Sequence, residues 1–349
     1  MIKMIDVANH AKVSIKTVSR VVNNEPSVQP EYKEKVLKSI ELLGYVPSTS
    51  ARTLRSNRSY QVNFITDSSR NLFSNRVLFG AMQACHDMGY QLVLDLIERH
   101  KQDDSDFTNR WIEKLLLKTK PEGILTLPPL SLNRQFVDKL IDAKIPVVNI
   151  GGISVNDKQG AVTINDKLAA EEMTTYLIAK GHRRIGFVMG VINQSSALER
   201  LKGYKMALLK NGIPFDQALV YQGDFHLESG LAAGNNLLSK KFRPTAIFAS
   251  NDEMAAGVMV AAKNLGVNVP NQLSVTGFDD NFFITSFLPG LTTIRQPLEE
   301  FGRAAIEILD SMRGNPNNVT SGEQKCLGHE LIERDSVADL TRSASKKTL

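Results

Sequence analysis

The sequence predicts an N-terminal all-α helix-turn-helix head followed by an α/β core of two parallel-sheet lobes. Residues 4–45 carry only helical patterns, whereas from Gln61 onward short apolar runs alternate with longer amphipathic stretches. The length of 349 residues fits two or three domains. With 42% hydrophobic and 23% charged residues, the composition is that of a globular protein, which excludes disorder of the whole chain.

The head is expected to contain three helices. Met4–Ala11 and Ile15–Val22 each place apolar residues on one face, and Ser14 stands in a good N-cap position before the second helix. Pro30 suits the first turn of a third helix, which Gly44 ends. Two short helices joined by a turn of about three residues, with a third bracing them, form a helix-turn-helix unit.

The net charge of +5 is concentrated near the N-terminus. Residues 1–60 hold ten Lys/Arg and five Asp/Glu, whereas the rest of the chain holds 32 of each sign. A small basic module on a neutral body favours nucleic acid or an anionic membrane surface as partner. A basic face that is merely solvated is the alternative. Residues 46–60 form a polar, basic linker in which a helical turn at Ser50–Arg55 is too short to be stable alone.

The core alternates strands with helices, the order that produces parallel sheets covered by helices on both sides. This number of strands fits two sheets better than one, and Gly151–Gly160 is expected to connect the lobes. The expected strands are Val62–Thr66, Gln91–Leu96, Gly123–Leu127, Val147–Ile150, Val162–Ile164, Ile185–Met189, Leu219–Tyr221, Ala246–Ala249 and Leu273–Thr276.

The head carries a specific resemblance. Ile5–Asn23 resembles the DNA-binding segment of the LacI/GalR repressor family almost position for position, and Leu42–Pro47 and Ala51–Arg55 match the end of that family's third helix and its hinge. The core resembles the same family over roughly Val62–Ser336, which implies a periplasmic-binding-protein-like core with a ligand cleft between two lobes.

The resemblance implies how the chain is divided. The expected parts are a head at 1–47, a hinge at 48–60, a core at 61–334 and a flexible tail at 335–349. Within the core, lobe 1 is expected at about 61–160 and 291–318, and lobe 2 at about 161–290 and 319–334.

The second helix of a helix-turn-helix meets base edges in the major groove. Lys and Arg donate hydrogen bonds to guanine and Ile packs against a thymine methyl, so Ile15, Lys16 and Arg20 are the expected base contacts. Hydroxyl and amide side chains suit phosphates and fix position only. The expected phosphate contacts are Ser14, Thr17, Ser19, Asn23 and Tyr45, of which Ser14 also reads as a plain N-cap.

The family's hinge folds into a short helix in the minor groove, where a leucine wedges between base steps. Leu54 holds that position here, with Ala51 one turn before it and Arg52 beside it as further minor-groove residues. The alternative is that Leu54 is a linker leucine covering the junction.

Polar residues follow three core strands, at the sheet edge where open α/β folds bind ligands. The expected effector contacts, by resemblance to the family, are Phe73, Ser196, Arg200, Phe225, Asn251 and Asp279. A guanidinium, an amide and a carboxylate together suit the hydroxyls of a sugar. Structural alternatives exist: Asn251 caps the next helix, Phe225 belongs to the core, or Arg200 pairs with Asp279.

Three positions depart from the family pattern. Lys12 stands in the turn where the family has Gly or Asn and where φ is often positive, which costs Lys more than Gly. Gln29 replaces the usual Ser or Thr cap before the third helix. Gly151 stands where some members have a ligand-binding Asp, so the first-lobe half of the effector site is not defined by the sequence.

Other function classes have little support. No triad, phosphate-binding loop or dinucleotide fingerprint appears, so we expect no enzyme, catalytic residue or cofactor. Two cysteines and six histidines show no metal spacing, and no apolar run suits a membrane span or a signal peptide. The resemblance to the LacI/GalR family implies a dimeric repressor of carbohydrate-utilisation genes that acts in the cytoplasm. Its partners would be pseudo-palindromic operator DNA and a sugar or glycoside.

Three alternatives remain at this stage. A sugar-binding transport component would need no basic head. A glycoside-processing enzyme would need an acid/base pair. An activator differs from a repressor only in where its operator lies.

Overall fold

The computed structural model describes residues 2–22, 27–45, 58–67, 72–97, 105–286, 288–314 and 322–341. The chain divides into two compact units, Met1–Tyr60 and Gln61–Leu349. Asn23 and the hinge residues Ala51, Arg52 and Leu54 lie outside the described residues.

The three predicted head helices are confirmed. They are α1 (Met4–Ala11), α2 (Ile15–Val22) and α3 (Pro30–Leu43). Their apolar faces bury a small common core, made of Val7, Ala8, Ala11, Val18, Val21, Val36 and Tyr45. The packing of these faces holds three helices that are each too short to be stable alone.

Local chemistry sets the ends of these helices. The Ser14 hydroxyl accepts a hydrogen bond from the Thr17 N–H at 3.1 Å and so caps α2, as predicted. Gln29 makes no side-chain cap bond, and Pro30 opens α3 instead. Lys12 ends α1 in the left-handed region with φ of 53°, so the departure from the family's small residue does carry a backbone cost at this turn.

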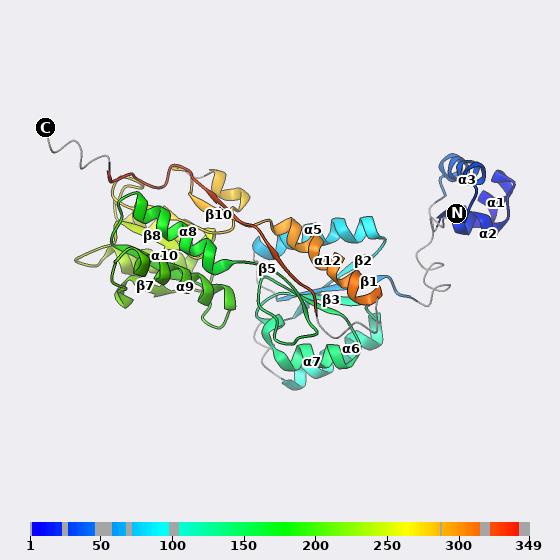
Figure 1. Cartoon of the computed structure of the whole chain (residues 1–349), viewed down its shortest axis with the longest axis horizontal. Helices are drawn as coiled ribbons and strands as arrows, with labels where there is room; N and C mark the ends of the chain where they lie inside the picture. Colours follow the sequence, from blue (N-terminus) through cyan, green and yellow to red (C-terminus); the bar gives the residue numbers. More distant parts are fainter. Residues whose placement is uncertain are drawn as a thin grey trace. The chain divides into compact units, whose positions relative to one another are not determined.

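The first lobe of the core is built on a six-stranded parallel sheet. Helices α5 (Leu72–Met88) and α12 (Leu298–Gly314) cover one face, and α6 (Ser105–Thr119) and α7 (Arg134–Asp142) cover the other (Figure 1). The strands, in spatial order, are β11 (Gln324–Leu327), β5 (Gly160–Ile164), β4 (Val147–Ile150), β3 (Gly123–Thr126), β1 (Gln61–Asp67) and β2 (Gln91–Ile97).

The second lobe is built on a four-stranded parallel sheet. The pair α8 (Asp166–Ala179) and α9 (Ser195–Lys210) covers one face, and α10 (Leu227–Leu238) and α11 (Asp252–Asn264) cover the other. The strands, in spatial order, are β7 (Val220–Gln222), β6 (Ile185–Met189), β8 (Ala246–Ala249) and β9 (Ser274–Thr276).

All nine predicted strands are present, with ends shifted by a residue or two. The described residues add β11 and an antiparallel pair, β10 (Thr293–Arg295) with β12 (Glu330–Ile332). Three short 3₁₀ turns complete the described elements, η2 (Leu130–Leu132), η3 (Gln217–Leu219) and η4 (Phe282–Ser286).

The expected lobe boundaries need correction. Gly151–Gly160 does not connect the lobes, because it joins β4 to β5 and both strands belong to the first sheet. The chain first crosses at Asn165, between β5 and α8. It returns between β10 and α12, and crosses a third time between β11 and β12, so residues 324–327 belong to lobe 1. A strand's neighbour in a sheet depends on pairing between distant segments, which local patterns do not report.

In both lobes, paired helices touch backbone to backbone at glycines. A Cβ atom added to Gly302 of α12 would lie 2.1 Å from the Val77 oxygen of α5, and one added to Gly80 would lie 1.8 Å from the Glu299 oxygen. Gly230 and Gly257 form the same kind of contact between α10 and α11, at 2.2 Å in each direction. These distances leave no room for a side chain at the contact points.

Candidate functional site

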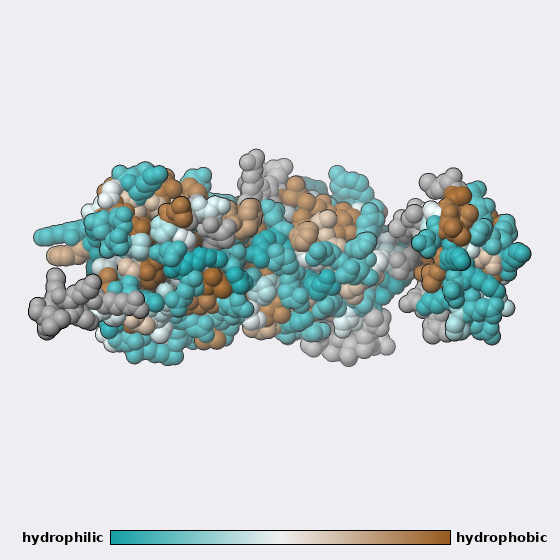
Figure 2. Space-filling view, turned by 90° about the horizontal axis from the view of Figure 1, so that it is seen from above, coloured by the Kyte–Doolittle hydropathy of each residue, from teal (hydrophilic) through white to brown (hydrophobic). Residues whose placement is uncertain are grey.

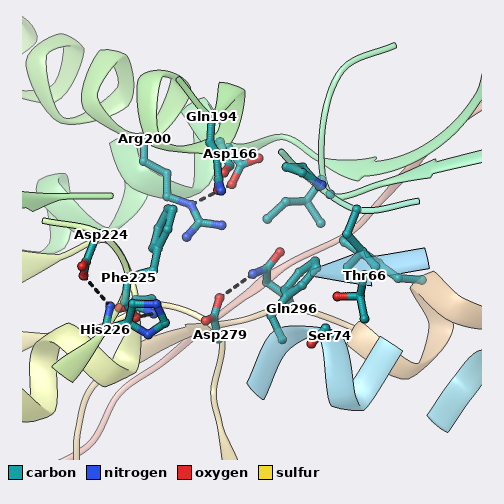
Figure 3. Close-up of a pocket in the computed structure, with 18 residues that line it drawn as sticks. Thr66, Ser74, Asp166, Gln194, Arg200, Asp224, Phe225, His226, Asp279 and Gln296 are labelled. Atoms are coloured by element: carbon teal, nitrogen blue, oxygen red, sulfur yellow. Dashed lines mark hydrogen bonds and ion pairs between the residues drawn. The ribbon is translucent and has the colours of Figure 1, made fainter. Parts of the chain in front are cut away.

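A pocket lies between the two sheets of the core, lined by residues from both lobes (Figure 3). It sits at the carboxyl ends of β1, β3, β4, β6, β8 and β9, where open α/β sheets hold ligands. The six side chains that the sequence singled out all line it: Phe73, Ser196, Arg200, Phe225, Asn251 and Asp279.

Arg200 enters the pocket from α9 and is 5% exposed. Its Nε donates to the Asp166 carboxylate at 2.8 Å, and its Nη1 donates to the main-chain oxygen of Ser250 at 2.5 Å. The guanidinium also lies 3.6 Å from the ring centre of Phe278, a cation–π contact. Burial raises the pKa of Asp166 and Arg200 opposes that rise. The ion pair at 2.8 Å makes Asp166, and not Asp279, the structural partner of Arg200.

Asp279 follows β9 in a two-residue turn with unusual backbone geometry. Its φ is 114° and that of Asp280 is 55°, in the region that non-glycine residues rarely adopt. Its carboxylate accepts a hydrogen bond from the Gln296 amide at 2.6 Å. Such strain persists only where surrounding contacts hold the turn, and it is often found at ligand sites.

Asn251 and Phe225 each combine the two roles between which the sequence left a choice. The Asn251 side chain caps α11, accepting from the Met254 N–H at 2.9 Å, and its amide donates to the Phe225 oxygen at 2.8 Å while the residue lines the pocket. Phe225 packs against both neighbouring core clusters and also faces the pocket. Its ring lies so close to Gly190 that a Cβ there would be 1.9 Å from the ring.

The first-lobe wall is largely apolar, with Thr66 and Ser74 as its polar residues. Phe73, in the first turn of α5, meets Phe301 edge-on with ring centres 6.1 Å apart. A Cβ on Gly151 would lie 2.8 Å from the Phe73 ring, so the position of the family's Asp is filled here by a phenyl ring. Leu127 and Pro128 continue this wall.

Sequence reasoning missed several residues of this pocket. Gln296 was not singled out, although it is a polar residue directly after the short segment that forms β10. Asp166 follows the N-cap Asn165 and looked like an ordinary acidic residue of a first helical turn. The other missed polar residues of the pocket are Thr66 and Ser74 from lobe 1 and Gln194, Asp224 and His226 from lobe 2.

Burial raises the pKa of Asp279 from 3.8 to about 7, although Arg200 and the Gln296 hydrogen bond favour the ionised form. Between pH values of about 4 and 7, Asp279 is therefore protonated in the folded core and ionised in the unfolded chain. It follows that the stability from this group is present below about pH 4 and is lost as the pH rises towards 7.

We therefore expect the unfolding free energy of the ligand-free protein to fall between about pH 5 and pH 8. This fall should exceed that of its Asp279→Asn variant by on the order of 2 kcal/mol. Asn keeps an oxygen that can accept from Gln296 and does not titrate. Thermal unfolding of both proteins across this range measures the difference. Parallel pH profiles would contradict the assignment.

The predicted DNA-reading side chains lie on α2, with Ile15 and Lys16 in its first turn and Arg20 in its last turn. Ile15 is 42% exposed and Lys16 is exposed, whereas Arg20 is partly covered. Among the predicted phosphate contacts, Ser14 is exposed, and Thr17 and Ser19 are partly exposed. Tyr45 differs, because its ring belongs to the core of the head and only 8% of its surface remains exposed.

Within the described residues, no cluster of His, Cys, Asp or Glu could hold a metal ion. Nor is any helix among those residues both long and apolar enough to span a membrane.

A helix-turn-helix head joined to a two-lobed core with a polar pocket defines a class of protein, the ligand-responsive DNA-binding regulators. Comparison with known proteins makes this specific. Residues 3–48 match the model for bacterial regulatory proteins of the lacI family, and residues 174–337 match a periplasmic binding protein-like domain. The chain belongs to the lacI family and is a DNA-binding transcriptional repressor of that family.

Its relatives match it over most of its length. It is 34% identical over 305 residues to catabolite control protein A of Priestia megaterium, covering 87% of this chain and 90% of that protein. It is 33% identical over 311 residues to the ribose operon repressor of Escherichia coli K12, covering 88% and 92%.

Two solved structures share the whole architecture. The lac repressor dimer bound to operator and the anti-inducer ONPF has a TM-score of 0.75 and 25% identity, covering 97% of this chain and 99% of that chain. A complex of the regulator CelR with cellobiose has a TM-score of 0.72 and 28% identity, covering 96% and 100%.

Proposed function

We propose that this chain is a homodimeric repressor of carbohydrate-utilisation genes, active in the cytoplasm, whose affinity for a pseudo-palindromic operator is set by an uncharged sugar or glycoside. The observation that carries this proposal is the pocket, in which six side chains expected from the sequence meet between two lobes. One relative is named as the repressor of a ribose operon and a similar structure holds cellobiose, which supports the choice of effector class.

The head supports the DNA-binding half of the proposal. The start of α2 presents Ile15 and Lys16 to solvent, and the Ser14 cap leaves the helix end open to a phosphate. Lys16 and Arg20 would read guanine, and Thr17 and Ser19 would fix position on the backbone. Leu54, with Ala51 and Arg52, remains our candidate for the minor-groove wedge at the operator centre.

The charge of the pocket supports an uncharged effector. Arg200 lines the pocket but is already paired with Asp166, while Asp224, and Asp279 in its ionised fraction, contribute negative charge. A phosphate or carboxylate group would therefore enter without a matching cation, which is costly in a buried site. The opposite wall of Phe73, Phe301 and neighbouring apolar residues suits the C–H face of a sugar or an apolar aglycone.

Exposed apolar side chains of lobe 1 support a dimer. Figure 2 shows a hydrophobic patch over α5. On that helix Phe79 is 55% and Met82 is 53% exposed, and on the edge strand β2 Leu94 is 48% and Leu96 is 60% exposed. Such patches mark interaction sites, and sheet edges invite pairing unless they are covered.

The experiment that tests the DNA-binding half begins with selection of bound genomic fragments by the purified protein. We expect a palindromic site, and we expect Lys16→Ala to weaken binding to it by about five- to 150-fold, as for one lost base contact. Lys35→Ala is the matched control, because Lys35 also lies in the head but pairs with Glu31 on α3. Equal losses in both variants, or salt-sensitive binding without any motif, would contradict sequence-specific reading.

The effector half is tested by thermal shift with matched sets of neutral hexoses, their phosphate esters and their uronic acids. Neutral compounds should raise the melting temperature and change operator affinity, because only a ligand that prefers one lobe arrangement shifts binding. Stronger effects from the charged members would contradict the charge argument.

The proposal includes no catalytic role. Asp280 is held by Arg295 and Arg334, so the neighbouring carboxyl groups of Asp279 and Asp280 do not form a free acid/base pair. Hydrolysis of chromogenic glycosides by the purified protein would support the enzyme alternative instead.

A further inference from the structure

Arg76 joins the two lobes next to the pocket. It lies on α5 of the first lobe, where its Nε and Nη2 donate to the Glu299 carboxylate at 2.8 and 2.7 Å. Its Nη1 donates to the main-chain oxygen of Asp280 in the second lobe, at 3.1 Å. Glu299 therefore fixes the guanidinium from within lobe 1, and the remaining donor reaches across to lobe 2.

The acceptor of this cross-lobe bond is part of the strained turn described above. The Asp280 carboxylate is held within lobe 2 by Arg295 at 2.7 Å and Arg334 at 2.6 Å. The preceding residue, Asp279, points its carboxylate into the pocket. Arg76 and a ligand bound at Asp279 would thus contact the same two-residue turn, Asp279–Asp280, from opposite sides.

A second contact fixes the other end of this helical turn. Burial raises the pKa of the Glu253 carboxyl group, in the first turn of α11, and the Leu72 N–H at the start of α5 partly opposes that rise, so these two groups lie close together. Glu253 follows Asn251 and Asp252 directly, so this contact also ends beside the pocket. Phe73 and Ser74, between the two contacts, line the pocket itself.

We propose that Arg76, with Glu253, forms an interlobe clasp that holds the first turn of α5 against the second lobe and so favours the closed arrangement of the pocket. The inference deepens the proposed function, because it assigns a step in the response to effector. Arg76 acts as a positioning residue: its bond to Asp280 exists only while the lobes are closed. Removing it lowers the closed fraction and weakens apparent effector affinity in proportion.

The clasp can be tested without effector or DNA by measuring the distance between the lobes. Spin labels are placed at Leu117→Cys on α6 and Leu209→Cys on α9, which are 83% and 73% exposed and lie in different lobes. Cys326→Ser removes the exposed native thiol, and Cys85 is buried. Labelled protein is diluted with unlabelled protein, so that a dimer carries one labelled protomer.

We expect Arg76→Gln to move the distance distribution to longer values. Arg76→Lys should do the same, because Lys keeps the charge for Glu299 but lacks the fork that reaches Asp280 at the same time. The matched control is Arg303→Gln, since Arg303 pairs with Asp87 at 3.1 Å and links the same helices, α12 and α5, within lobe 1.

An unchanged distribution in Arg76→Gln would overturn the clasp. Rescue by Arg76→Lys would also overturn it, because it would assign the effect to the ion pair with Glu299. An equal shift in the Arg303→Gln variant would show that the longer interlobe distance comes from loosened packing of α5 on α12. None of these outcomes bears on operator binding, so the proposed function is judged separately by the selection experiment.

Discussion

Replacing Arg200 by methionine is expected to destabilise the core by about 3–5 kcal/mol, the usual cost of removing one partner of a buried ion pair. The side chains of Arg200 and Asp166 are 6% and 14% exposed, so little water can compensate the remaining carboxylate. Met fills a similar volume, and therefore a cavity is not the cause. The variant should also lose its response to effector, since Arg200 lines the pocket.

Denaturant unfolding measures this loss, and two further variants identify its origin. Lys202→Met is the control on the same helix, because Lys202 pairs with Glu199 at 2.6 Å but is 62% exposed, and such pairs contribute about 0–1 kcal/mol. Asp166→Asn, added to Arg200→Met, removes the stranded charge and should recover part of the stability. If the double variant is no better than the single one, the buried charge is not responsible.

Replacing Gly302 by alanine is expected to cost about 3 kcal/mol or more, although alanine in a helix normally adds about 0.5–1 kcal/mol over glycine. The steric clash outweighs the gain in helix propensity, because the new Cβ would lie 2.1 Å from the Val77 oxygen and 2.4 Å from the Ala81 nitrogen. These are backbone atoms of α5 and cannot rotate away. The helices must separate, which also moves Phe73 and Arg76 on α5.

The control for this prediction is Gly328→Ala, where a Cβ would meet nothing within 4 Å. We expect its unfolding midpoint to stay within about 0.5 kcal/mol of the parent. A midpoint for Gly302→Ala that equals or exceeds the parent's would show that α5 and α12 can move apart freely, and it would remove the basis for a rigid first-lobe wall.

The sequence predicted the elements well because their signals are local. Ser14, Pro30 and Gly44 mark helix ends within the head, and nine short apolar runs mark the strands. Strand β11 was missed because its residues alternate between exposed and half-exposed at a sheet edge, which leaves only a weak apolar signal. Strands β10 and β12 have three residues each and pair antiparallel outside the two main sheets, so the alternating order of strands and helices did not indicate them.

The candidate site was predicted only in part, for a related reason. Arg200, Asn251 and Asp279 follow recognisable motifs, and the structure brings them to one pocket. Their partners come from elsewhere in the chain: Asp166 precedes Arg200 by 34 positions, and Gln296 follows Asp279 by 17. The interlobe clasp is harder still to predict from the sequence, because Arg76 and Asp280 are separated by 204 positions and meet only when both lobes are folded.

The threefold crossing between the lobes bears on how a cell makes this protein. Lobe 1 begins at Gln61, yet its sheet and its helical cover need β11 and α12, which leave the ribosome almost last. The head is complete by Tyr45 and can fold as soon as it emerges. During most of its synthesis the nascent chain therefore carries a folded DNA-binding head attached to a lobe 1 that still lacks α12 and β11. A message truncated before α12 would yield a head that no effector could control.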